Sequence, residues 1–263
     1  MLRSLVVVLA CLLVAGFDGP PPQSPVKDLG PIGGSVQVGS ESAKDVAFTD
    51  SLDFRLLGPG GELQVKVTLY GRLETVNTRE QFGFRLAFDS AEREWSGFSE
   101  EFAAAFDYSS DFVGAVMALS GSRRTMKFDA SFTRDGKPVD PEKEESSSPV
   151  GRSLLIMENS GVTITQGEQI FDYGLTHLLE QDDRAHRFEI SGIAEGIGEF
   201  EGRRVVSVRI ADQTRAGGQL LEARGVYLMD VATGIFFWGH LEVSGIRFGS
   251  YSCELTIRQD FKL

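Results

Sequence analysis

Three histidines, the side chains best suited to acid–base chemistry near neutral pH, occur in the sequence as His177, His186 and His240. His177 and His186 flank Asp182 and Asp183, and these residue types can together ligate zinc or manganese. The group has neither a histidine pair at i, i+4 spacing nor a cysteine partner. We therefore interpret this segment as a solvated acidic loop and predict no metal site.

Motifs for a catalytic nucleophile or a bound phosphate are incomplete. The run Gly151–Ser153 begins a nucleophile elbow, but Leu155 stands where its second glycine belongs. The run Gly196–Gly198 begins a dinucleotide fingerprint, but Glu201 replaces the third glycine, and a carboxylate there would repel a pyrophosphate. We predict no catalytic residue and no cofactor. The 38 acidic residues leave a carboxylate-dependent hydrolase as an alternative that sequence cannot locate.

Sequence geometry is most specific around a C-terminal hairpin whose connection is Asp230–Gly234. If Asp230 faces Gly234, cross-strand neighbours sort into two faces. One face carries only apolar pairs: Met229–Ile235, Tyr227–Phe237, Ala223–Leu241 and Leu221–Val243. The other is apolar near the turn and ionisable farther away: Leu228–Phe236, Val226–Trp238, Arg224–His240 and Glu222–Glu242.

This register has a consequence for the apolar face, because it places Gly225 opposite Gly239 and leaves a gap where two side chains are missing. A ring from a neighbouring strand is the expected filler, and a small ligand is the alternative.

A second consequence concerns the rings on the other face. Phe236 and Trp238 need a cover, because contiguous exposed apolar surface marks a contact site. A segment of the same chain, with residues 175–179 as a candidate, is favoured over a partner protein. We predict that Phe236, Trp238, His240, Gly225 and Gly239 form a binding site for an unknown protein or a small apolar ligand.

The hairpin belongs to a chain in which hydrophobicity alternates with period two. Residues 63–69, 82–88 and 126–132 each alternate apolar and polar side chains, as half-buried strands do. Short Gly-containing connections separate residues 205–210, 220–229, 235–244 and 251–258, and such connections favour an antiparallel meander. Short helices are expected at 99–106 and 172–181, each behind a capping residue. The predicted fold is mainly β, a sandwich or partly open barrel with one or two short helices and a C-terminal β-meander.

The first sixteen residues predict a secretory signal peptide. Arg3 precedes an apolar run that ends at small residues before Phe17, where cleavage is expected. The run is shorter than the roughly twenty residues a membrane-spanning helix needs, so no integral span is expected after signal removal. We predict an exported, periplasmic or extracellular protein.

The mature chain is expected to have two parts. Residues 17–50 are rich in proline and glycine and predict a flexible tether, and residues 51–263 form a β-rich globular region. A division of that region near 140–150 is left open, because proline, charges and three serines gather there. Cys253 is the only cysteine left after processing and shares strand parity with apolar neighbours, which predicts a buried thiol without a disulfide.

Charge narrows the choice of partners. The formal net charge of −12 becomes −13 once Arg3 is lost, and this excess would repel nucleic acid. The leading hypothesis is an exported, non-catalytic, β-rich protein that binds a partner or a small apolar ligand. The alternatives are an extracytoplasmic hydrolase whose site forms only in three dimensions, and an outer-membrane β-barrel.

Overall fold

The structure is a computed structural model that describes residues 17, 19–58, 61–78, 81–97, 126–133, 161–174, 189–216, 219–248 and 251–263. Within these ranges the regular secondary structure consists of β-strands alone. The strands are β1 (Ser35–Gln37), β2 (Val46–Gly58), β3 (Gly61–Asn77), β4 (Gln81–Ser96), β5 (Met126–Thr133), β6 (Thr163–Thr165), β7 (Gln169–Gly174), β8 (Glu189–Phe200), β9 (Arg203–Ala216), β10 (Gln219–Asp230), β11 (Phe236–Phe248) and β12 (Tyr251–Lys262).

Ten strands form one antiparallel sheet in the order β5-β4-β3-β2-β12-β11-β10-β9-β8-β7, while β1 pairs with β6. Strands consecutive in sequence are neighbours from β2 to β5 and from β7 to β12, so each run is a meander. The pairing of β12 with β2, from Ser252 with Leu57 to Lys262 with Ala47, joins the two meanders. Among the described strands, β5 and β7 are edges and the sheet does not close. The mainly β antiparallel fold and the C-terminal meander are thereby confirmed.

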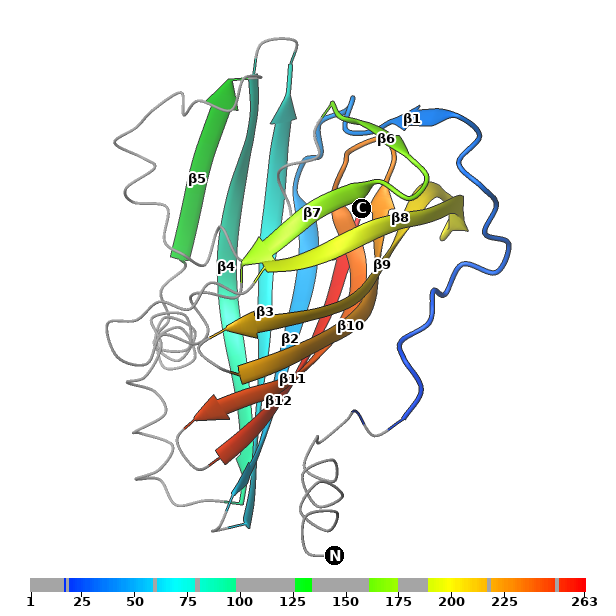
Figure 1. Cartoon of the computed structure of the whole chain (residues 1–263). Coiled ribbons are helices and arrows are strands. Elements are labelled where there is room, and N and C mark those ends of the chain that lie inside the picture. The colour runs from blue at the N-terminus through cyan, green and yellow to red at the C-terminus, as the bar shows by residue number, and fades with distance from the viewer. Residues whose placement is uncertain are drawn as a thin grey trace, which may run out of the picture.

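The sheet is strongly twisted, as extended sheets of L-residues are. In Figure 1, β2, β3 and β4 run nearly upright, whereas β7 and β8 cross the view. Neighbouring strands nevertheless remain hydrogen-bonded along the whole order.

Alternation along the strands gives this sheet two chemically different faces. The face that we call the inner face is lined by buried apolar side chains: Leu52, Phe54 and Leu56 of β2, Val67 and Leu69 of β3, Val208 and Ile210 of β9, Tyr227 of β10, Leu241 and Val243 of β11, and Leu255 and Ile257 of β12. Burying each such side chain contributes roughly 1.5–3 kcal/mol, so this face is the main source of stability. The opposite, outer face carries polar side chains over β2, β3 and β12.

The segment expected to be a flexible tether is folded onto the sheet instead. Val26, Ile32, Val36 and Val38 are buried, and residues 46–50 begin the central strand β2. The backbone of residues 30–41 pairs with other elements, for example through Gly39 N–H, which donates to Val231 O at 3.0 Å. Proline and glycine interrupt regular structure here, but isolated apolar residues between them still bury, and the backbone is satisfied by neighbouring strands and turns.

The expected helix at 172–181 is wrong at its start, because residues 172–174 belong to β7. Its remainder, the expected helix at 99–106 and the division near 140–150 lie outside the described residues, as do the leader 1–16, His177 and His186. No helix in the described part of the chain is long and apolar enough to cross a membrane.

Candidate functional site

The hairpin between β10 and β11 has a different register from the predicted one. Asp230 faces Ile235 rather than Gly234, because Gly234, at φ 73°, donates its N–H back to Asp230 O at 2.8 Å. Oδ2 of Asp230 accepts hydrogen bonds from N–H and Oγ1–H of Thr233, at 2.9 and 2.7 Å. The side chain of Asp230 thus closes a longer connection than sequence suggested.

A β-bulge follows between Leu228 and Met229, where β11 carries one extra residue. On the far side of the bulge the pairs are shifted by two residues, so Arg224 faces Glu242 and Val226 faces His240. A two-residue shift keeps each side chain on its predicted face. On the turn side of the bulge the shift is one residue, so a side chain there, such as that of Phe236, lies on the opposite face from the predicted one.

The bulge separates the two rings that sequence had placed together. Phe236 pairs with Met229 and lies fully buried on the inner face, with its ring 5.9 Å from that of Tyr227. Trp238 pairs with Leu228 on the outer face and lies 6.3 Å from the ring of Phe200. The predicted shared surface of Phe236 and Trp238 is therefore wrong.

The predicted gap between two glycines is also wrong, since Gly225 faces Leu241 and Gly239 faces Tyr227. A Cβ added at Gly239 would lie 2.2 Å from the Tyr227 ring, and one at Gly225 would lie 2.5 Å from the carbonyl oxygen of His240. Each glycine is thus in close contact with a neighbour. At Gly239 that neighbour is the ring of Tyr227 on β10.

Residues 17 and 19–38 form a segment that we call the N-terminal strap, and its part from Gly19 to Gly30 contacts β8, β9 and β10. Gly30 and Ile197 exchange two backbone hydrogen bonds of 2.9 Å. A Cβ at Gly196 would meet the Leu29 side chain at 2.8 Å, and one at Gly198 would meet Val26 at 2.5 Å. The two glycines that began a dinucleotide fingerprint therefore allow the strap to approach β8. The outer face is covered here by the chain itself, and the predicted cover at 175–179 lies outside the described residues.

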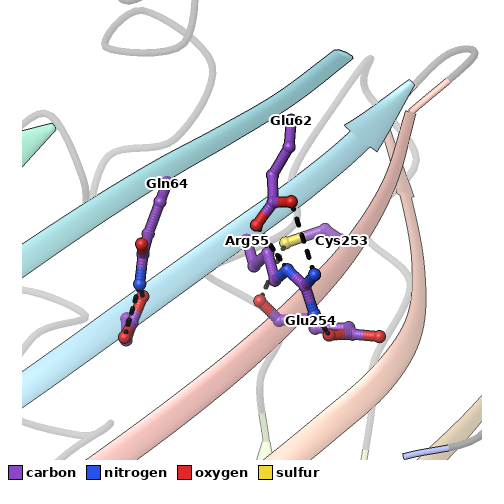
Figure 2. A network of polar contacts seen from close by, with 6 residues as sticks. Arg55, Glu62, Gln64, Cys253 and Glu254 are labelled. Carbon is purple, nitrogen blue, oxygen red and sulfur yellow. Dashed lines mark hydrogen bonds and ion pairs between the residues drawn. The ribbon is translucent and has the colours of Figure 1, made fainter. Parts of the chain in front are cut away.

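Beyond the strap, the outer face carries a polar network across β3, β2 and β12 (Figure 2). Nε of Arg55 donates to Glu62 at 2.6 Å, and its Nη1 lies 3.5 Å from Glu254. Nε2 of Gln64 donates to both carboxylate oxygens of Asp53, at 2.9 and 3.0 Å. These groups are mostly solvated, so each pair contributes little to stability, but together they fix side chains around a depression.

That depression has a volume of about 190 Å³ and is lined by Phe17, Asp53, Arg55, Gln64, Arg224, Glu242, Val243, Glu254, Leu255 and Thr256. Arg224, whose side chain is only 17% exposed, forms one wall. Its Nε donates to Glu242 at 2.7 Å, its Nη1 donates to the carbonyl oxygen of Gly19 at 3.1 Å, and its Cζ lies 3.9 Å from the centroid of the Phe17 ring.

His240 lies on β11 opposite Val226 of β10, and its side chain is partly buried. Its Nε2 is 3.5 Å from a carboxylate oxygen of Glu242 but makes no hydrogen bond within the described part of the chain. Desolvation lowers the pKa of His240, the nearby Arg258 lowers it further, and the carboxylate of Glu242 opposes them. The imidazole is therefore neutral near pH 7, and it contributes a polar side chain without a charge.

The inner face contains one feature that sequence reasoning missed, a polar pair at Asp50 and Gln259. The two residues face each other across β2 and β12, and both are 4% exposed. Nε2 of Gln259 donates to the carbonyl oxygen of Phe236 at 2.6 Å. Oδ1 of Asp50 has no hydrogen-bond partner among the described residues. Burial raises the pKa of the Asp50 carboxyl to about 7, although a hydrogen bond with the Ser51 backbone lowers it.

A signal for this pair was present in the sequence. Asp50 has the same strand parity as Phe48, Leu52 and Phe54, so it is the polar member of an apolar face. Assigning residues 17–50 to a tether concealed that alternation. Within the described ranges, no group of three or more His, Cys, Asp or Glu side chains is placed to hold a metal ion.

Comparison with known proteins identifies no family. No family model matches the sequence, and no curated protein matches it. A solved structure described as "Lipid-protein interactions in lipovitellin" is 10% identical with a TM-score of 0.41, and the match covers 86% of this chain and 25% of that one.

Two other structures match over most of both chains. DynF from the dynemicin biosynthesis pathway of Micromonospora chersina is 12% identical over 92% of each chain, with a TM-score of 0.21. A DUF1329 family protein from Desulfovibrio piger is 10% identical over 83% of this chain and 85% of its own, with a TM-score of 0.19. All three TM-scores lie below 0.5, so these likenesses carry no argument about this chain.

Proposed function

We propose that this chain is an exported, non-catalytic, β-rich protein that binds an apolar ligand on the inner face of its sheet, with Asp50 at the polar end of that ligand. The observation that carries the proposal is a buried carboxyl group, set among apolar side chains, one oxygen of which has no hydrogen-bond partner among the described residues. Buried polar groups in folded proteins are almost always hydrogen-bonded, so an exception at the centre of a sheet needs a physical reason.

Packing alone does not supply that reason. Leaving a buried acceptor unpaired costs on the order of 1–3 kcal/mol, and a leucine at position 50 would continue the apolar surface of Phe48 and Leu52. Position 50 is therefore occupied by a residue that lowers stability. Departures of this kind are expected where a binding function is served.

The chemistry of the inner face defines the ligand class. The apolar side chains around Asp50 would contact a hydrocarbon body, and Oδ1 would accept a hydrogen bond from one polar group of the ligand. A hydroxyl or an amine at the end of an aliphatic chain meets both requirements. A fully apolar hydrocarbon would leave the carboxyl unpaired, and a highly charged ligand would not enter an apolar face.

A protein partner bound through the hairpin rings is less well supported. Phe236 is buried on the inner face, and the N-terminal strap lies over neighbouring strands on the outer face. The rings therefore do not combine into one surface that a partner would cover.

The experiment is a titration of the purified protein with a fluorescently labelled long-chain alcohol. Asp50→Leu removes the acceptor and is expected to weaken binding about tenfold or more, since one hydrogen bond to a carboxyl is worth about 1.5–3 kcal/mol. Asp53→Leu is the matched control, because Asp53 lies on the same strand but on the outer face, where Gln64 donates to it. Its affinity for the probe should equal that of the wild type. Equal affinities for all three proteins, or no binding by the wild type, would refute the proposal.

A further inference from the structure

The first described residue of the N-terminal strap is fixed to the outer face by contacts with one arginine. The Phe17 ring lies over the Arg224 guanidinium at 3.9 Å, and Nη1 of Arg224 donates to the carbonyl oxygen of Gly19. An arginine over an aromatic face contributes more when it is partly desolvated, as Arg224 is. Phe17 is therefore held at the wall of the depression described above, which it helps to line.

The charges that line this depression do not balance. Three carboxylates, Asp53, Glu242 and Glu254, face two guanidinium groups, Arg55 and Arg224. Glu242 pairs with Arg224 and Glu254 pairs with Arg55. The third carboxylate, Asp53, accepts its side-chain hydrogen bonds from a neutral amide, that of Gln64. The lining thus carries one net negative charge beside Phe17, and one additional cation would neutralise it.

The sequence supplies such a cation if the leader is removed where its pattern predicts. Hydrolysis of the Gly16–Phe17 peptide bond by an export peptidase consumes one water molecule and leaves a carboxylate on Gly16 and an amine on Phe17. An α-amine has an ordinary pKa of about 7.7–8.0, so it is largely protonated near neutral pH. Its position is set by the Phe17 ring on Arg224.

We propose that the depression on the outer face is the binding site of the mature amino terminus, in which the α-ammonium group of Phe17 is held by Asp53 and its neighbouring carboxylates. Processing would then complete the fold, because the new charge fastens the start of the strap to β2, β11 and β12. This inference rests on the export half of the proposed function and not on ligand binding.

The test uses the full chain, leader included, produced in a host that exports it. Intact-mass measurement of the purified protein should give Phe17 as the first residue. Reductive methylation with ¹³C-formaldehyde then labels the α-amine, and its pKa is read from the pH dependence of its NMR signal. We expect that pKa to lie about one unit or more above its ordinary value, because nearby carboxylates favour the charged form.

Two variants separate the proposed contact from a general effect of charge. Asp53→Asn keeps a side chain that can bond to Gln64 but removes the charge, and it should return the α-amine pKa to its ordinary value. Glu74→Gln is the matched control, because Glu74 is an exposed acid on β3 that pairs with Arg85 and does not line the depression. It should leave the pKa raised.

The outcomes distinguish this inference from the proposed function. A mature protein that begins at another residue overturns it, as does an α-amine whose pKa is ordinary or does not respond to Asp53→Asn. None of these results affects the alcohol titration, which depends on the inner face.

Discussion

Asp50 places an ionisable group in the apolar centre of the sheet, and its energetics can be worked out with their sign. Burial raises the pKa of its carboxyl from an ordinary 3.8 to about 7 in the folded protein. Between these two values the unfolded chain has released the proton while the folded protein retains it. The folded state binds more protons over this range, so its stability falls as pH rises.

The prediction is therefore a loss of stability between about pH 4 and pH 7. Once the pH exceeds both pKa values of Asp50, the unfolding free energy is lower by about 4 kcal/mol than it is below both. Urea unfolding at a series of pH values measures this slope. In Asp50→Asn the contribution from this residue should vanish, whereas in Asp53→Asn, a change at the outer face of the same strand, it should remain. Equal slopes in the two variants would show that another group is responsible.

Cys253 shows where residue-level reasoning from sequence works. Its parity with apolar neighbours on one strand predicted a buried thiol, and the structure confirms a free, buried cysteine on β12. Burial raises the pKa of this thiol to about 12, so the reactive thiolate is almost absent at neutral pH. Asp50 follows the same alternation along β2. Its place on a buried face was not predicted, because the prolines and glycines before it suggested that no strand had yet begun.

At the scale of elements, faces could be predicted and registers could not. Period-two alternation depends on each strand alone, so the buried faces of β3 and β10 follow directly from it. Register depends on the connection, and the Asp230 side chain and Gly234 backbone make that connection longer than the assumed one. One bulge then moved Phe236 to the opposite face from Trp238, which changed the candidate site without changing the strands.

The contact between β10 and β11 gives a prediction about Gly239. Gly239→Ala would place a methyl group within 2.2 Å of the Tyr227 ring, which is itself buried and unable to move freely. Such overpacking should lower the unfolding free energy by about 1–3 kcal/mol.

Gly33→Ala provides the control for this change, because among the described residues no atom outside Gly33 and its two chain neighbours lies within 4 Å of the added methyl group. Its effect should stay within about 0.5 kcal/mol. Urea denaturation of both variants measures the difference. If the two variants are equally stable, the ring does not pack on the glycine as the register requires.

At the scale of the whole molecule, two segments far apart in sequence meet at the centre of the sheet. β2 follows the N-terminal strap and β12 ends the chain, yet they pair over almost their whole length. The two meanders are therefore halves of one sheet rather than separate layers. Sequence indicated two runs of strands with an irregular segment between them, but long-range pairing leaves no local pattern, so the way in which the runs join was not predictable.

This pairing predicts that the two meanders unfold together. Each contains one of the two tryptophans, Trp95 in β4 and Trp238 in β11, so single-tryptophan variants report on one half at a time. Urea transitions followed by Trp95 fluorescence, by Trp238 fluorescence and by far-ultraviolet circular dichroism should coincide, as in a two-state transition. The substitution Ile257→Pro removes a backbone donor from β12, which pairs with both β2 and β11, and should weaken both halves equally. Separate midpoints for the two tryptophans in the otherwise unchanged protein would mean that the halves are independent domains joined only by weak pairing.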